Sequence, residues 1–195
     1  MAKTSQVVLL ENEFYLIKAP NGKVLEVKNF NTENGGLVQL WDYAGQPWQQ
    51  WKFLDAGEGR WRIQNRFTGK MMDLVYAGVV EGTWIHQWSR TSGLSQCWVL
   101  EPTRNGRTRI RNVLADKFID LVGMNTSNGA QAQIWPEVQG GNQEWDLVRV
   151  DSSTAVIPPR PPEARTPGQT PAQRKHKNDI VRKLNNAGKG RKAEK

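Results

Sequence analysis

The sequence contains very few of the residues that build catalytic and metal centres. One cysteine, Cys97, and two histidines, His86 and His176, occur among 195 residues. A lone cysteine excludes an intrachain disulfide, and so few thiol and imidazole groups argue against a metal site. Cys97 and His86 would be the nucleophile and base candidates, but Cys97 occupies the variable centre of a repeated triplet, as expected of an ordinary strand cysteine. We therefore expect no catalysis, no metal and no other cofactor.

Long hydrophobic runs are also missing. No stretch approaches the ~18 apolar residues of a membrane-spanning helix, so we expect that this is not an integral membrane protein. Residues 1–12 hold a four-residue apolar run, which is too short for the core of a signal peptide and lacks a small-residue cleavage pattern. Together with the missing disulfide pair, this favours cytoplasmic synthesis in a reducing compartment, and leaderless export or release is left open.

Charge is distributed unevenly along the chain. Residues 1–150 contain 16 Lys and Arg against 15 Asp and Glu, whereas residues 151–195 contain 11 against 4 together with six of the ten prolines. Such a composition cannot bury enough apolar surface to fold alone, so a domain boundary is expected near residue 150. We predict a Pro-rich linker over 151–170 and a basic tail over 171–195.

The basic tail has the sequence signals of one short amphipathic helix. Thr170 is a candidate N-cap and Pro171 a candidate first helical residue. A narrow apolar stripe follows on an otherwise basic segment: Ile180, Val181, Leu184 and Ala187. Such a helix suits nucleic acid, an anionic surface or an acidic protein partner, and a merely solubilising tail is the alternative.

The most informative feature present is an internal triplication with a period of 47 residues. Three Gln-x-Trp triplets begin at Gln49, Gln96 and Gln143. The same step relates three further positions in each repeat. They are an acidic residue (Glu26, Asp73 and Asp120), a lysine (Lys23, Lys70 and Lys117) and a second tryptophan (Trp41, Trp88 and Trp135). Three copies without insertions between matched positions predict three equivalent structural lobes, each able to carry a site of the same kind.

Each repeat reads as short β-strands. Apolar and polar residues alternate around Trp61–Ile63 and Ile110, turns such as Asn34-Gly35-Gly36 punctuate the strands, and no segment before residue 150 keeps a helical period. We predict an all-β domain over 13–150 after a lead-in of 1–12, with repeats at about 13–56, 57–103 and 104–150. Its core should contain the triplet tryptophans Trp51, Trp98 and Trp145, with the triplet glutamines satisfying backbone groups where strands bend.

This arrangement resembles the ricin-B-type β-trefoil lectins. The resemblance covers residues ~13 to 150 and implies a twelve-stranded β-trefoil with up to three shallow sugar sites. Val24, Met71 and Phe118 stand where members of that family commonly have disulfide cysteines, so apolar packing is expected to replace those bonds. The resemblance also implies that an early acidic residue, an aromatic residue 15 positions later and an amide near the triplet form each sugar site.

The third repeat has every part of that pattern. Asp120 would accept two sugar hydroxyls, Trp135 would stack on the apolar face of the sugar, and amides would come from Gln133, Asn142 and Gln143.

The other two repeats depart from the pattern. The second repeat keeps Asp73 and Trp88, but His86 replaces the first amide and Ser95 stands where Asn142 does, so we expect a weaker site. In the first repeat Gln39 and Trp41 are kept, Glu26 replaces the aspartate and Trp48 occupies the Asn142 position. That site is either inactive or has a different ligand.

Two structural alternatives stay open at this point. Trp41, Trp88 and Trp135 could be packing residues, and Asp73 and Asp120 could be carboxylates that cap turns. The function expected first is a multivalent, non-catalytic lectin for galactose-type or related glycans. The alternative is a docking protein that uses the trefoil as a scaffold and the basic tail as an anchor to nucleic acid or an acidic partner.

Overall fold

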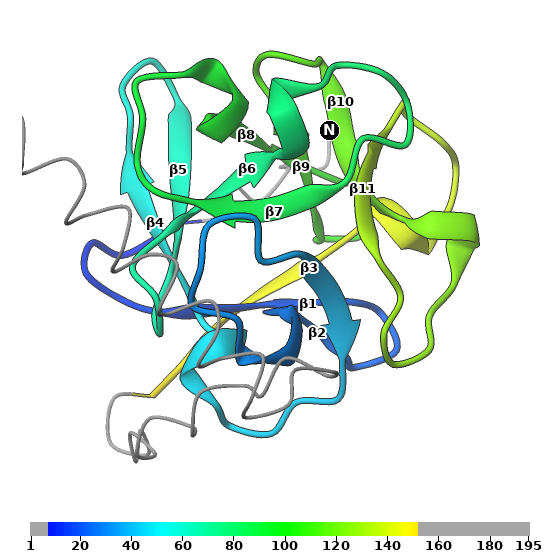
Figure 1. Ribbon diagram of the computed structural model, residues 1–195. Helices are drawn as coiled ribbons and strands as arrows, with labels where there is room; N and C mark the ends of the chain where they lie inside the picture. The colour runs from blue at the N-terminus through cyan, green and yellow to red at the C-terminus, as the bar shows by residue number, and fades with distance from the viewer. Residues whose placement is uncertain (1–7, 152–195) are drawn as a thin grey trace, which may run out of the picture. The chain divides into compact units, whose positions relative to one another are not determined.

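The computed structural model describes residues 8–151, which form one all-β domain of twelve strands (Figure 1). The predicted β-trefoil is therefore confirmed. In chain order the strands are β1 Tyr15–Lys18, β2 Val24–Val27, β3 Val38–Trp41, β4 Trp51–Asp55, β5 Arg60–Asn65, β6 Met71–Leu74, β7 Ile85–Trp88, β8 Trp98–Pro102, β9 Thr108–Asn112, β10 Lys117–Leu121, β11 Ala132–Trp135 and β12 Asp146–Arg149. The linker and tail expected beyond residue 151, and His176 within them, lie outside the described residues.

Six of the strands close into a barrel. Antiparallel pairs join β12 to β1, β1 to β4, β4 to β5, β5 to β8 and β8 to β9. The ring is completed by an isolated bridge in which Thr108 and Trp145 exchange two backbone hydrogen bonds of 2.9 Å. A closed barrel leaves none of these six strands as an unpaired edge.

The other six strands form three hairpins, β2–β3, β6–β7 and β10–β11, one in each lobe. Isolated bridges connect the hairpins in a cycle: Leu37 to His86, Trp84 to Gln133, and Gln39 to Gln131. Figure 1 shows β3, β7 and β11 around the centre that the lobes share. Lobe 1 thus comprises β1–β4, lobe 2 β5–β8 and lobe 3 β9–β12.

Short 3-10 helices flank the hairpins at equivalent places in each lobe. Those after the first hairpin strand are η1 Lys28–Phe30, η3 Val75–Ala77 and η5 Val122–Met124, and those before the last strand of each lobe are η2 Pro47–Gln49, η4 Leu94–Gln96 and η6 Gly141–Gln143. Within residues 8–151, no helix has the length and apolarity that crossing a membrane requires.

The triplet tryptophans form the centre of the core, as predicted. Trp51, Trp98 and Trp145 are fully buried in one apolar cluster. Burial of an indole of this size stabilises the fold by about 4 kcal/mol or more relative to exposure. Trp51 Nε1 donates to the Leu25 carbonyl at 2.9 Å and Trp98 Nε1 to that of Met72 at 3.2 Å. Each of these two indoles thereby joins the barrel to the hairpin of its own lobe.

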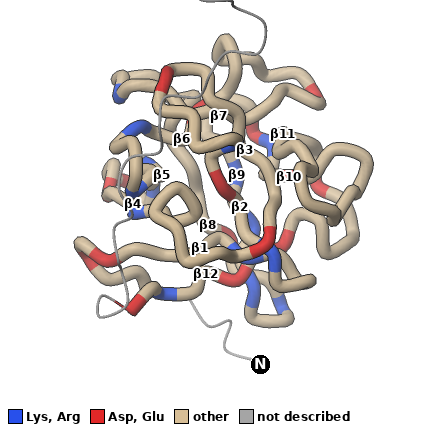
Figure 2. The backbone as a smooth tube through the Cα atoms, turned by 60° about the horizontal axis from the view of Figure 1, so that its bottom comes forward, with Lys and Arg blue, Asp and Glu red and all other residues tan. Residues whose placement is uncertain are grey.

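Apolar packing occupies the positions at which the resemblance noted from the sequence implies disulfide cysteines. Val24, Met71 and Phe118 are all buried, each directly opposite the second tryptophan of its hairpin. Lys, Arg, Asp and Glu are interspersed along the backbone in Figure 2. The described domain therefore lacks the strong positive charge of the chain beyond residue 151.

Candidate functional site

The hairpin register explains the 15-residue spacing between acid and tryptophan. The acid pairs directly across the hairpin with the residue 13 positions later: Glu26 with Gln39, Asp73 with His86, and Asp120 with Gln133. Directly opposite residues share one face of a β-ladder, and the next residue on that face lies two positions further on. The second tryptophan of each repeat therefore lies on the same face as the acid.

The third lobe gathers its predicted residues around one carboxylate. Asp120 Oδ1 accepts a hydrogen bond from Gln133 Nε2 at 3.2 Å. Asp120 Oδ2 accepts from Asn142 Nδ2 at 2.7 Å and from Gln143 Nε2 at 2.9 Å. The structure thus brings Gln133, Asn142 and Gln143 to Asp120, although 22 and 23 residues separate the last two from it.

Asp120 as a whole residue is only 3% exposed. Burial is the largest influence on it and raises the pKa of Asp120, while the hydrogen bonds from Gln143 and Gln133 act in the opposite direction. The Oδ1 atom of Asn142 is also buried and has no hydrogen-bond partner among the described residues. Because an unsatisfied buried acceptor costs free energy, it marks a place where a ligand hydroxyl could donate.

The second tryptophans lie where one lobe meets the next. A Cβ atom added to Gly82 of lobe 2 would lie 3.8 Å from the Trp135 ring and 3.6 Å from Gln133 Oε1. Gly129 has the same relation to Trp41, and Gly35 to Trp88. Trp41 and Trp88 remain 40% and 39% exposed, and Trp135 is half-buried. Each ring therefore lies close to a glycine of the neighbouring lobe and keeps an accessible part.

The second lobe keeps the carboxylate but changes its surroundings. Asp73 Oδ2 accepts from Gln96 Nε2 at 2.8 Å, while Oδ1 accepts from the Leu74 backbone at 2.7 Å. His86 stacks on Trp88 with ring centroids 5.4 Å apart. Burial lowers the pKa of His86, against the opposing influence of Asp73. At neutral pH the imidazole is therefore uncharged, and one side of this tryptophan is covered by the histidine.

The first lobe is filled by its own side chains. Glu26 Oε1 accepts from Gln39 at 2.8 Å and Oε2 from Gln49 at 2.9 Å. Trp48, at the position of Asn142, is buried and packs against Phe30 at 4.2 Å and Phe67 at 5.8 Å between ring centroids. Burial raises the pKa of Glu26, which the hydrogen bonds from Gln39, Gln49 and Trp48 oppose. An indole thus occupies the place that an amide has in lobe 3.

The first glutamine of every triplet contacts the acid of its lobe. Gln49, Gln96 and Gln143 each donate to that carboxylate and to a backbone carbonyl, and each accepts from a backbone N–H five residues earlier. The backbone role agrees with the expectation from sequence. The contacts of Gln49 and Gln96 with the acid were not expected, although a constant spacing of 23 residues between acid and glutamine in all three repeats is a readable signal.

Of the two residues considered for nucleophilic chemistry, His86 belongs to the lobe 2 site described above. Cys97 is buried, with Sγ 3.9 Å from the Gly93 carbonyl. In the range 8–151, no group of three or more His, Cys, Asp or Glu is arranged to hold a metal ion.

Comparison with known proteins agrees with this architecture. The family model described as ricin-type beta-trefoil lectin domain-like matches residues 6–88 and 94–161. No curated protein is similar to the sequence at a significant level. The three lobes and their repeated triplets define a β-trefoil of the lectin-like class.

The chain belongs to this ricin-type β-trefoil lectin-like family. Among solved structures, the designed three-fold symmetric protein ThreeFoil is 31% identical, with a TM-score of 0.69, and the match covers 70% of this chain and 99% of that one. An exo-beta-1,3-galactanase from Clostridium thermocellum is 28% identical with a TM-score of 0.70, over 73% of this chain but 31% of that one. The Macrolepiota procera ricin B-like lectin in complex with lactose shares the fold at 19% identity and a TM-score of 0.63, over 74% and 100% of the two chains.

Proposed function

We propose that this protein is a non-catalytic carbohydrate-binding lectin whose principal site is in lobe 3. The observation that carries the proposal is the arrangement of Asp120 and Asn142 beside Trp135. A carboxylate has about four lone-pair positions, and three amide donors occupy three of them. One acceptor position on Asp120 and the unsatisfied Oδ1 of Asn142 remain for sugar hydroxyls.

The site also offers the apolar contact that a sugar ring needs. Trp135 is half-buried and lies on the same hairpin face as Asp120. An aromatic ring held by the neighbouring lobe can stack on the C–H face of a sugar without losing much conformational entropy on binding. The carboxylate and amides then fix the orientation of the hydroxyls through charge-assisted hydrogen bonds.

The three lobes are proposed to be unequal. In lobe 2, His86 covers one side of Trp88 and a serine stands at the amide position, so this site is the weaker one. In lobe 1, Trp48 fills the space beside Glu26, and we propose that this lobe binds no sugar. With two sites of different strength, avidity for branched or clustered glycans exceeds the affinity of either site alone.

Galactose-type glycans are the ligand class proposed first. Two proteins of the same fold support this choice. One is an exo-beta-1,3-galactanase, and the other is a lectin in complex with lactose. The galactanase match covers less than a third of that chain, so it suggests a ligand class and no activity.

The test is glycan-array and calorimetric binding at pH 7 with three matched variants. D120N keeps the shape of the side chain but removes the carboxylate, and D73N and E26Q make the same change in lobes 2 and 1. Loss of the one charge-assisted hydrogen bond that Asp120 can still accept from a sugar hydroxyl predicts a decrease in affinity of about tenfold for D120N. D73N should reduce the number of sites or the avidity, and E26Q should change neither. Absence of binding to every glycan, or equal binding by wild type and D120N, would refute the proposal.

A further inference from the structure

The three junctions between lobes are not equivalent. At the junction of lobes 3 and 1, Asn128 Oδ1 accepts from the Asp42 backbone at 3.1 Å and from Lys23 Nζ at 2.8 Å. At the junction of lobes 1 and 2, Asn34 Oδ1 accepts from the Ser89 backbone at 2.9 Å. In both places one asparagine side chain ties a hairpin turn to the end of the neighbouring hairpin.

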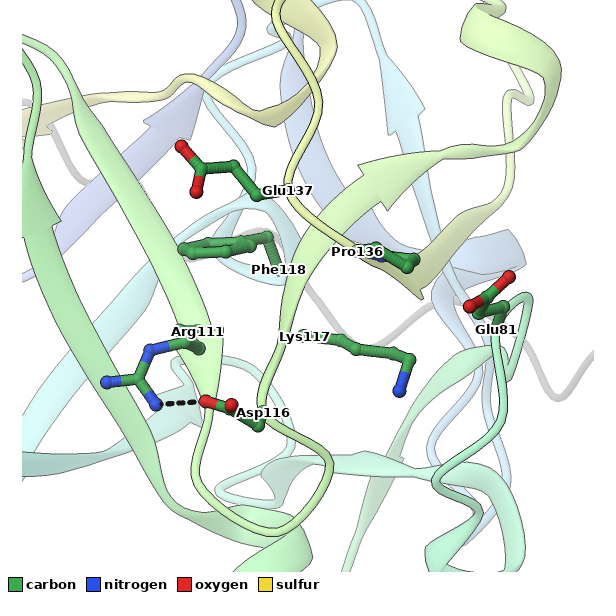
Figure 3. Close-up of a pocket in the computed structure, with 7 residues that line it drawn as sticks. All are labelled: Glu81, Arg111, Asp116, Lys117, Phe118, Pro136 and Glu137. Atoms are coloured by element: carbon green, nitrogen blue, oxygen red, sulfur yellow. Dashed lines mark hydrogen bonds and ion pairs between the residues drawn. The ribbon is translucent and has the colours of Figure 1, made fainter.

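The junction of lobes 2 and 3 cannot form this tie. Glu81 stands where Asn34 and Asn128 stand, and Pro136 stands where Asp42 and Ser89 stand. Proline has no backbone N–H to donate. Instead, a pocket of about 370 Å³ opens there, lined by Glu81, Arg111, Asp116, Lys117, Phe118, Pro136 and Glu137 (Figure 3).

Most charges that line the pocket are already paired. Arg111 contacts Glu101 and Asp116, and Glu137 contacts Arg109. By contrast, neither Lys117 nor Glu81 takes part in an ion pair among residues 8–151. Lys117 Nζ makes one long hydrogen bond, 3.5 Å to the Ala115 carbonyl. Figure 3 shows its ammonium and the Glu81 carboxylate on the same side of the pocket.

The pocket adjoins the lobe 3 site. Phe118 pairs directly with Trp135 and lies on the same hairpin face as Asp120, two residues or ~6.6 Å along the strand. Gly82, which follows Glu81, lies close to both Gln133 and Trp135. The pocket volume falls within the ~300–1,000 Å³ of small-molecule sites, so there is room for a sugar ring beside the first one.

We propose that this pocket is a second subsite, which receives the neighbouring ring of an oligosaccharide whose first ring is bound at Asp120; the proposal rests on the carbohydrate-binding function of lobe 3. Lys117 donates to hydroxyls of the second ring and Glu81 accepts from them, while Phe118 and Pro136 form an apolar wall. One free cation and one free carboxylate balance each other, so the ring is a neutral hexose. Lobe 3 thereby selects disaccharides and longer chains over monosaccharides.

The experiment compares galactose with galactose-terminated disaccharides of different linkage, lactose included, by calorimetry on the full-length chain. Wild type should bind at least one disaccharide about tenfold more tightly than galactose, as expected for two added hydrogen bonds to charged groups. E81A and K117A should remove this gain and leave galactose affinity unchanged. K70A is the matched control, because Lys70 is the lobe 2 equivalent of Lys117 and belongs to the junction of lobes 1 and 2. It should change neither galactose nor disaccharide affinity.

A double variant tests the junction itself. E81N/P136S introduces the side chain and the backbone N–H that tie lobes 1 and 2, and it should abolish the disaccharide gain while galactose still binds. If the wild type binds galactose but binds no disaccharide more tightly, or if E81A and K117A keep the higher disaccharide affinity, the subsite is refuted. Galactose binding at Asp120 would then still stand. If galactose and every disaccharide fail to bind, the proposed function fails and the subsite fails with it.

Discussion

The buried carboxylate of Asp120 should give opposite pH responses in sugar binding and in folding stability. Because burial raises its pKa, the folded protein holds this proton more tightly than the unfolded chain does. The protonated form accepts hydrogen bonds from sugar hydroxyls poorly. We therefore expect affinity to be lost as pH falls through the raised pKa, which lies above the ordinary aspartate value of about 3.9.

The size of the effect follows from the release of one proton. Each pH unit below the pKa of Asp120 leaves a tenfold smaller ionised fraction, so sugar affinity should fall about tenfold per unit. For stability the sign is reversed. The raised pKa contributes stability that is fully present below the unfolded pKa, and that is lost as pH rises through the folded value. Relative to D120N, the wild type should thus lose free energy of unfolding between about pH 3.9 and the raised value.

Glu26 supplies the matched control. It is also buried, its pKa is also raised by burial, and it occupies the equivalent position in lobe 1, but Trp48 fills the space beside it. E26Q should change the pH dependence of unfolding and leave that of sugar binding unchanged. The assays are calorimetric binding and urea unfolding of wild type, D120N and E26Q from pH 3.5 to 7.5. An affinity that stays constant as pH falls through this range, or an E26Q variant that loses the acid decline in binding, would refute the reasoning.

Two further predictions concern stability. Trp51 Nε1 donates to a buried carbonyl, whereas Trp145 Nε1 has no partner among the described residues. In urea unfolding, W51F should therefore lower the free energy of unfolding by about 1 kcal/mol more than W145F does. Equal decreases would contradict the hydrogen bond of Trp51. Trp48 is buried against Phe30 and Phe67, so W48A should lower the free energy of unfolding by about 3–5 kcal/mol and leave glycan affinity unchanged. A loss of sugar binding in the folded W48A variant would show that lobe 1 contributes to sugar binding.

Much of the fold could be predicted from sequence because its information is local and repeated. The 47-residue period, the short alternating strands and the buried tryptophans of the triplets describe one lobe three times, and closure of three such lobes leaves few architectures. The constellation around Asp120 was predicted in composition from the resemblance to the ricin-B-type family, and the structure explains why part of it is visible in the sequence. The acid and Gln133 face each other across a single hairpin, where the separation in sequence fixes the pairing.

Contacts between secondary-structure elements were decided by the tertiary structure. Gln143 was placed in a site because the third repeat matches the whole family pattern, whereas Gln49 and Gln96 were not assigned to the carboxylates, because their repeats depart from that pattern. Nor did the sequence decide whether lobe 1 was inactive or bound a different ligand. The side chain of Trp48 hydrogen-bonds to Glu26 and packs on Phe30, so the indole lies beside this carboxylate, which supports the proposal of an inactive lobe.

By itself, then, the sequence determined three β lobes and a tryptophan core, because both follow from spacing within one repeat, and the resemblance to a known family supplied the unequal set of acid, amide and ring residues. The junctions between lobes required the tertiary structure. Glu81 and Pro136 are separated by 55 residues and have no shared pattern in the chain. They meet only because the trefoil brings the turn of one hairpin against the end of the next, and their chemistry leaves that junction open beside the lobe 3 site.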